Sequence, residues 1–132
     1  MTEASGRTIV HLIEPQQLFV PALVEVFSEA GLAVDHVAAQ VDPRLLLEKQ
    51  PDLVFLDTDY INEPLENVRL SHVLLPQAQI FVYATAPSDA IFRAFTSAGA
   101  DVVLEKSADR RAIVQALYLV ERKRRQRHVH DG

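Results

Sequence analysis

The most constraining feature of the sequence is the run Leu53-Val54-Phe55-Leu56, which is apolar without a break and lies between Asp52 and Asp57. Its length suits a β-strand, and valine and phenylalanine favour one. A strand without polar alternation is apolar on both faces, so it belongs in the middle of a sheet that is covered on both sides. Asp57 would then lie at the carboxyl end of that strand, where open α/β sheets bind their ligands.

The composition limits the kinds of protein that this chain can be. Its 132 residues suit one domain, and with 48% hydrophobic residues and few Gly and Pro it can bury a core. The absence of cysteine excludes a disulfide scaffold and thiolate metal sites. No apolar run approaches the length of a membrane span, and the polar residues 1–7 do not resemble a signal peptide. We therefore expect a cytoplasmic protein that does not enter a membrane.

The charges are unevenly distributed along the chain. Residues 121–132 hold five of the 13 basic residues and only two of the 18 acidic ones, which leaves 8 bases and 16 acids in residues 1–120. An acidic body does not attract nucleic acid, so binding of nucleic acid by this domain is not expected. The basic residues of 122–127 are interpreted as a solvated helix end, where cations are favoured.

Strand and helix patterns alternate five times with short connections. The predicted strands are 8–14, 32–38, 52–57, 78–84 and 101–104, and the predicted helices are 16–30, 43–50, 65–75, 88–98 and 108–127. Such alternation predicts an α/β fold with a parallel sheet, helices on both faces and right-handed crossovers. The five units fill the chain, so we predict one domain over residues 1–127 and a disordered polar tail over 128–132.

Four polar residues lie at the predicted carboxyl ends of strands: Glu14, Asp57, Thr85 and Lys106. If the strand order is 2-1-3-4-5, the topological switch point lies between the first and third strands, and Glu14 and Asp57 face each other across it. Thr85 and Lys106 would then stand on the other side of Asp57. The alternative for Asp57 is an acid that only forms a turn after a buried strand.

Four motifs in order carry a resemblance to a known family: Ile-Val-His-Leu-Ile-Glu (9–14), Pro-Asp-Leu-Val-Phe-Leu-Asp (51–57), Ile-Phe-Val-Tyr-Ala-Thr-Ala (80–86) and Ala-Gly-Ala-Asp-Val-Val-Leu-Glu-Lys (98–106). Together they resemble the receiver domain of two-component response regulators, over residues 8 to about 122. The resemblance implies the flavodoxin-like, CheY-like (βα)5 fold, a three-layer sandwich around a parallel five-stranded sheet in the order 2-1-3-4-5.

The resemblance also implies a phosphorylation switch in a phosphorelay. Asp57 would accept a phosphoryl group from a histidine kinase or phosphotransfer protein, with Mg²⁺ held by Glu14, by Asp57 and by the backbone carbonyl of Asp59. Lys106 would pair with the phosphoryl oxygens, and the Thr85 hydroxyl would move to bond them. The added charge would change a partner or homodimer face formed by the helix 88–98, the strand 101–104 and the last helix. The domain would not be an enzyme beyond its own phosphorylation and dephosphorylation.

Three features depart from the family pattern. Pro15 stands where receivers usually carry a second acid, so Mg²⁺ binding should be weakened. Ser107 follows Lys106 at a position where receivers usually have a proline, often after a cis peptide bond. A cis peptide bond before a residue other than proline costs about 2.5–4 kcal/mol, so we expect this turn to have a different conformation here. The interval from Thr85 to Gly99 is one residue shorter than expected, so that Ala84 is an alternative for the switch position.

These departures leave two further hypotheses open. The first is a degenerate receiver that takes no phosphate and serves as an interaction or dimerisation module. The second is a flavodoxin-like enzyme or cofactor binder, which lacks support because no glycine-rich loop follows the first strand. Among single residues, Thr85 is either a switch hydroxyl or a helix N-cap, Lys106 either contacts phosphate or pairs with Glu105, and His11 is expected to be a hydrogen-bonded core histidine.

Overall fold

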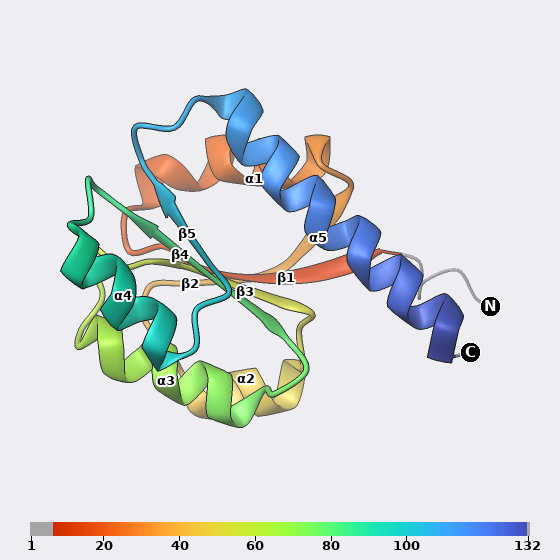
Figure 1. The fold of residues 1–132 in the computed structure, drawn as a ribbon, viewed down its shortest axis with the longest axis horizontal. Helices are drawn as coiled ribbons and strands as arrows, with labels where there is room; N and C mark the ends of the chain where they lie inside the picture. The colour runs from red at the N-terminus through yellow and green to blue at the C-terminus, as the bar shows by residue number, and fades with distance from the viewer. Residues whose placement is uncertain (1–6, 132) are drawn as a thin grey trace.

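A computed structural model of the chain describes residues 7–131, with side chains described through residue 120. Its five strands are β1 (Thr8–Ile13), β2 (Leu32–Ala38), β3 (Leu53–Asp57), β4 (Gln79–Ala84) and β5 (Val102–Glu105). Its α-helices are α1 (Val20–Glu29), α2 (Pro43–Lys49), α3 (Pro64–Leu74), α4 (Asp89–Ala98) and α5 (Arg110–Asp131), and a 3-10 helix, η2 (Gln17–Phe19), precedes α1 (Figure 1).

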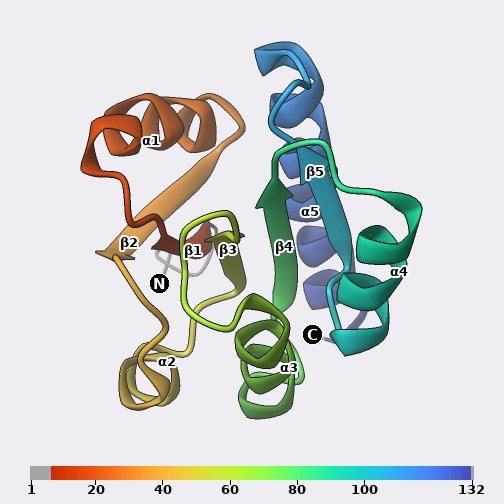
Figure 2. The same cartoon turned by 90° about the vertical axis from the view of Figure 1, so that its left-hand side faces the viewer.

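The strands form one parallel sheet in the order β2-β1-β3-β4-β5, which confirms the predicted α/β fold and strand order. Helices α1 and α5 lie on one side of the sheet and α2 and α3 on the other, as the end-on view in Figure 2 shows. The β3 strand is central, hydrogen-bonded to β1 on one side and to β4 on the other. The layered architecture therefore places Asp57, the last residue of β3, in the middle of the edge where the strands end.

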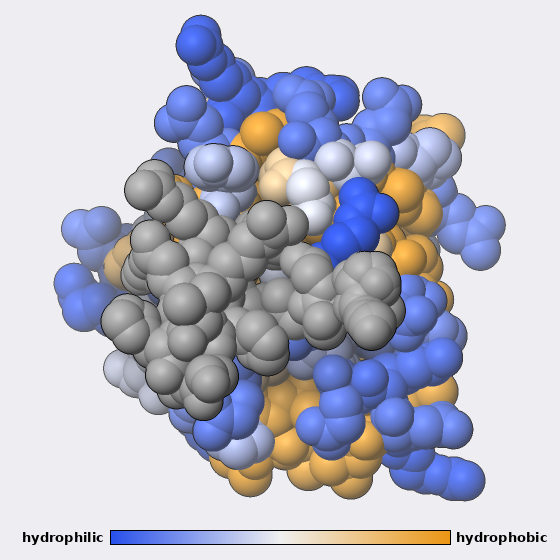
Figure 3. Space-filling model, turned by 90° about the vertical axis from the view of Figure 1, so that its right-hand side faces the viewer, coloured by the Kyte–Doolittle hydropathy of each residue, from blue (hydrophilic) through white to orange (hydrophobic). Residues whose placement is uncertain are grey.

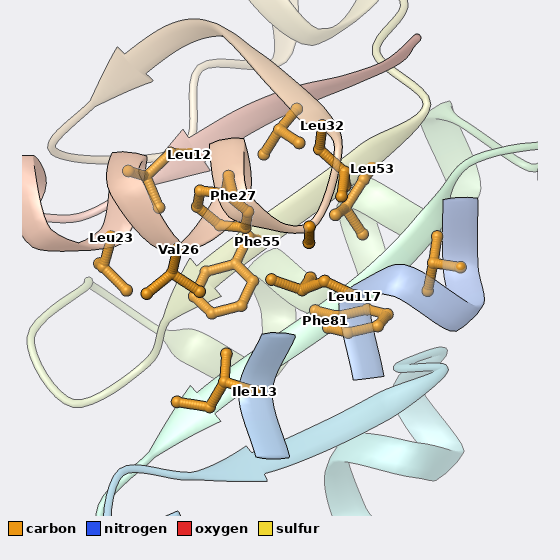
Figure 4. Close-up of a cluster of buried hydrophobic side chains, with 13 residues drawn as sticks. Leu12, Leu23, Val26, Phe27, Leu32, Leu53, Phe55, Phe81, Ile113 and Leu117 are labelled. Carbon is orange, nitrogen blue, oxygen red and sulfur yellow. The ribbon is translucent and has the colours of Figure 1, made fainter. Parts of the chain in front are cut away.

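The side chains of β3 alternate between two hydrophobic cores, which explains why its sequence shows no polar alternation. Leu53 and Phe55 join the core beneath α1 and α5, where the Phe55 ring meets the Phe27 ring edge-on at a centroid distance of 5.0 Å (Figure 4). Val54 and Leu56 join the core on the opposite face, with residues of α2, α3 and α4. Burial on both faces thus fixes β3 as the central strand.

Local sequence signals place the helix ends. Asp42 accepts a hydrogen bond from the Arg44 backbone N–H at 3.0 Å and precedes Pro43, so it is the predicted N-cap of α2. Ser88 caps α4 by accepting from the Ile91 backbone N–H at 3.2 Å. Gly99 ends α4 with φ of 121°, a conformation that favours glycine.

Two helix boundaries differ from the prediction. The predicted helix 16–30 begins instead with the turn of 3-10 helix η2, and α1 proper starts at Val20, so that Pro21 lies in its first turn where no hydrogen bond is lost. The last helix, α5, runs to Asp131, beyond the predicted end near residue 127. Residues 121–127 are all Glu, Arg, Lys or Gln, which favour helix, and no proline or glycine follows them before Gly132, so nothing stops the helix from continuing through 128–131.

The surface on the side where α5 ends is mostly hydrophilic in its described part, with hydrophobic side chains gathered toward its lower edge (Figure 3). No helix within residues 7–131 is long and apolar enough to cross a membrane. The side chains of the basic run 122–127 lie outside the described residues, so its interpretation as a solvated helix end stays a prediction.

His11 departs from the expectation of a hydrogen-bonded core histidine. Its side chain is buried, with 1% exposed, but neither ring nitrogen has a hydrogen-bond partner among the described residues. A bulge in β2 shifts the register after Val10, so that His36 pairs with His11 and the two rings stack at 4.9 Å. Burial is the larger cause, and the positive charge of the neighbouring His36 the smaller one, of a pKa of His11 that is lowered to about 4.

Candidate functional site

The carboxyl edge of the sheet brings together residues that are far apart in the sequence. Asp57 ends β3, while Glu14 follows β1, Thr85 follows β4 and Lys106 follows β5. Because the strands are parallel and adjacent, these four residues meet at one edge, as the strand order predicted. Asp59, two residues beyond Asp57 and also a predicted site residue, lies in the same network.

Buried Asp57 and partly exposed Lys106 form an ion pair. The Lys106 ammonium donates to Asp57 Oδ2 at 2.7 Å, and Asp57 Oδ1 accepts from the Asp59 backbone N–H at 3.1 Å. The Asp57 side chain is fully buried. Burial by itself would lower the pKa of Lys106, but its hydrogen bonds to Asp57 and Asp59 outweigh that effect and raise it. Lys106 is therefore a fixed positive charge against Asp57, and it does not pair with Glu105 as one alternative held.

Asp59 uses its carboxylate, not only its backbone, in the site. Its Oδ2 lies 2.9 Å from the Lys106 ammonium and 2.7 Å from the donating Thr85 hydroxyl, and its Oδ1 accepts from the Thr85 backbone N–H at 3.2 Å. Thr85 is consequently not the N-cap of α4, because Ser88 has that role. Ala84 is buried in the core, so Thr85 is the residue after β4 that presents its hydroxyl to the site.

Glu14 is buried beside Asp57 without a counter-ion of its own. Its Oε2 accepts from the Gln16 backbone N–H at 3.0 Å, but its Oε1 has no hydrogen-bond partner among the described residues. Burial, assisted by the neighbouring Asp57 carboxyl, raises the pKa of Glu14 from 4.5 to about 7. Pro15, the next residue, adds no side-chain oxygen, so Glu14 is the one acid that the end of β1 contributes.

Three aromatic rings surround the Lys106 ammonium, and the sequence analysis placed none of them in the site. Its nitrogen lies 5.2 Å from the ring centroid of Tyr60, 5.4 Å from that of Tyr83 and 5.9 Å from that of Phe19. Tyr83 and Phe19 also line a groove of about 470 Å³ between α1 and α5. The sequence does show that Phe19 follows β1 and Tyr60 follows β3, so both could have been expected near the carboxyl edge of the sheet. Sequence spacing does not show in which direction the two rings point.

The turn after β5 is built without proline. The backbone N–H of Ala108 donates to the carbonyl of Glu105 at 3.0 Å, which closes the turn through Ser107. Every described peptide bond is trans, in agreement with a rebuilt turn. The turn leaves Lys106 directed at Asp57 and Asp59.

The donor chemistry of the site fits a divalent cation that takes oxygen ligands. Glu14 Oε1 is a buried oxygen without a donor, and Asp57 and Asp59 supply further carboxylate oxygens, the hard ligands that Mg²⁺ prefers. As arranged here, no three His, Cys, Asp or Glu side chains in the described part of the chain form a metal-binding group, and Lys106 pairs with both Asp57 and Asp59. A cation would have to share the carboxylates of Asp57 and Asp59 with Lys106, and weakened Mg²⁺ binding stays a prediction.

The fold is similar to that of several solved response-regulator domains. A two-component response regulator of the LuxR family from Aurantimonas sp. SI85-9A1 superposes with a TM-score of 0.79 at 23% identity, over 89% of this chain and 86% of that one. The REC domain of AraT, a response regulator from Geobacillus stearothermophilus, gives a TM-score of 0.78 at 17% identity, over 92% and 98% of the two chains.

A third similar structure is a response regulator from Burkholderia pseudomallei with a phosphorylated aspartic acid, a calcium ion and citrate. It gives a TM-score of 0.72 at 22% identity, over 95% of this chain and 75% of that one. No model of a protein family matches the sequence, and no curated protein matches it at a significant level. The five-stranded order, the connectivity and these superpositions together show that the chain has the CheY-like fold of response-regulator receiver domains.

Proposed function

We propose that this chain is a receiver domain of a phosphorelay, in which Asp57 accepts a phosphoryl group. The observation that carries the proposal is the 2.7 Å ion pair between Lys106 and the buried Asp57, formed at the edge of the sheet where this fold binds its ligands. Glu14 and Asp59 flank the pair and complete an acidic pocket around one fixed cation. No other cluster of described residues combines a buried carboxylate, a cation and a hydroxyl in this way.

The chemistry requires positioning more than covalent assistance. An Asp57 oxygen would attack the phosphorus of a phosphohistidine, forming a phosphorus–oxygen bond as the phosphorus–nitrogen bond breaks, and the electron pair would return to the histidine nitrogen. Lys106 would stabilise the negative charge on the transferring oxygens. Mg²⁺, held by the carboxylates of Glu14 and Asp57 and by the backbone carbonyl of Asp59, would add further neutralisation of that charge when bound. Because the Asp57 side chain is fully buried, the side chains around it would have to shift before a donor could reach it.

The partners follow from this chemistry. A histidine kinase or a phosphotransfer protein would supply the phosphoryl group. A homodimer or an output partner would contact the face of α4, β5 and α5, where Ile91, Phe92, Tyr118 and Leu119 are exposed large hydrophobic side chains. Apolar side chains that stay in contact with water favour burial against a partner.

A second candidate is a degenerate receiver that acts as an interaction module without phosphorylation. It is favoured by the single acid at the end of β1, by the fully buried Asp57, and by the absence of a ready metal-binding group in the described residues. In this alternative the Asp57–Lys106 pair is a structural link between β3 and β5. Breaking such a buried pair leaves an uncompensated charge, so it would be retained for stability alone.

Incubation with a small phosphodonor and Mg²⁺, followed by intact-mass measurement, tests the first proposal. We expect addition of one phosphoryl group to the wild-type chain, loss of that addition in Asp57→Asn, and unchanged addition in Glu48→Gln, which removes an exposed acid on α2. If no adduct forms at any Mg²⁺ concentration, phosphotransfer to Asp57 is excluded and the second candidate stands.

A further inference from the structure

The Asp59 carboxylate binds the donors at the carboxyl edge of the sheet in the way that a bound anion would. It accepts from the Lys106 ammonium, the Thr85 hydroxyl and the Thr85 backbone N–H, at 2.9, 2.7 and 3.2 Å. Two of these donors belong to Thr85, which is 26 positions from Asp59 in the sequence and follows β4, and the third belongs to Lys106, which follows β5. Three donors converging on one small oxyanion make up an anion-binding site, and here a side chain of the chain itself occupies it.

The charge of Asp59 is stabilised in this position. Its side chain is 22% exposed, and this partial burial opposes the charge, but the hydrogen bonds from Lys106 and Thr85 outweigh it and keep the pKa of Asp59 below its ordinary value. Lys106 is shared, since its ammonium also lies 2.7 Å from Asp57 Oδ2. One cation therefore holds two carboxylates, and Asp59 alone also holds Thr85.

We propose that Asp59 is a built-in anion that keeps Thr85 and Lys106 in their anion-bound arrangement without any modification of Asp57. A phosphoryl group on Asp57 would need the same ammonium and hydroxyl, so Asp59 competes with it. This competition rests on the function proposed above, whereas the hold on Thr85 does not. Thr85 and Lys106 would then be fixed in position in the unphosphorylated chain, and the Asp59 carboxylate would oppose phosphorylation of Asp57 instead of assisting it.

The hold on Thr85 also fixes the segment that leads into α4. Residues 85–88 connect β4 to α4, and Ala86 within this segment has φ of 37°, a left-handed conformation that costs a non-glycine residue energy. The two bonds from Thr85 to Asp59 at one end and the Ser88 cap at the other stabilise it. The exposed side chains of Ile91 and Phe92 follow at once on α4, so Asp59 sets the position of a potential contact surface.

Amide hydrogen exchange measured by NMR on the full chain, without phosphodonor, tests the hold on Thr85. In Asp59→Ala the Thr85 amide loses its acceptor, and we expect it to exchange roughly tenfold faster than in the wild type. Asp59→Asn, which keeps an acceptor oxygen but loses the charge, should give a smaller change and serves if the alanine variant does not fold. Glu48→Gln, which removes an exposed acid on α2 away from the site, should leave the Thr85 exchange rate unchanged. Equal Thr85 exchange in the wild type and in Asp59→Ala would overturn the proposal.

Labelling by a small phosphodonor at saturating Mg²⁺ tests the competition separately. Loss of a like charge beside Asp57 should make Asp59→Ala react roughly tenfold faster than the wild type. If the wild type is labelled and Asp59→Ala is labelled no faster, the competition is refuted. If neither protein is labelled but Thr85 exchange is faster in Asp59→Ala, the built-in anion is supported and the proposed phosphotransfer has failed.

Discussion

Replacement of Glu14 by glutamine should stabilise the protein at neutral and alkaline pH. Glu14 is buried, with 2% exposed, and its Oε1 has no partner among the described residues, while its pKa is raised from 4.5 to about 7. A carboxyl group with a raised pKa binds its proton more tightly in the folded chain than in the unfolded one. Stability is therefore lost as the pH rises from about 4.5, and the full loss is present above about 7.

The size of the effect follows from the pKa difference. Each pH unit between 4.5 and about 7 is worth about 1.4 kcal/mol, so ionised Glu14 costs about 3 kcal/mol at pH 8. Glutamine keeps the acceptor for the Gln16 backbone N–H, places an amide group near Asp57 and carries no charge. The variant should gain about 3 kcal/mol over the wild type at pH 8 and little at pH 4.5, which corresponds to a rise of roughly 1–2 M in the urea midpoint at the higher pH.

Urea denaturation followed by circular dichroism between pH 4.5 and 8.5, with a chelator present, measures this difference. The comparison has to be made between variants at each pH, because His11 titrates in the opposite sense over an overlapping range. Glu48→Gln is the matched control, and its stability relative to the wild type should not change with pH. A Glu14→Gln advantage that is the same at pH 4.5 and pH 8 would refute the reasoning, since burial would then not act on the charge.

Three further substitutions, His11→Phe, Gly99→Ala and Gly31→Ala, test the packing of the fold outside the site. The pKa of His11 is lowered from 6.5 to about 4, so between these values His11 is neutral in the folded chain but protonated in the unfolded chain, and the free energy of unfolding falls as the pH drops below about 6.5. In denaturation experiments, the stability of His11→Phe relative to the wild type should therefore be about 2 kcal/mol greater at pH 5 than at pH 8. Gly99→Ala should lose about 2 kcal/mol or more, because a Cβ at φ 121° would lie 2.6 Å from His72 Cβ. Gly31→Ala, at φ 89° with open space around the Cβ, should lose about 1 kcal/mol by the same measurement, and equal losses at the two glycines would contradict the steric account.

The main features of the fold were available in the sequence because they depend on local patterns. The unbroken apolar run of β3 required burial on both faces, which only a central strand receives. Proline, glycine and the capping residues Asp42 and Ser88 marked helix ends through backbone preferences that act within a few residues. Parallel strands joined by short crossovers then brought Glu14, Asp57, Thr85 and Lys106 to one edge without any knowledge of side-chain contacts.

The arrangement of the site was decided by tertiary structure. The sequence alone left Thr85 between a switch hydroxyl and a helix cap, and only the packed structure shows it bonded to Asp59. The raised pKa of Glu14 depends on how completely neighbouring elements exclude water, and the stacking of His11 on His36 depends on a bulge that shifts one strand by a residue. Residue order fixes where each strand ends, but the direction and environment of a side chain depend on contacts with elements tens of residues away, which only the folded chain brings together.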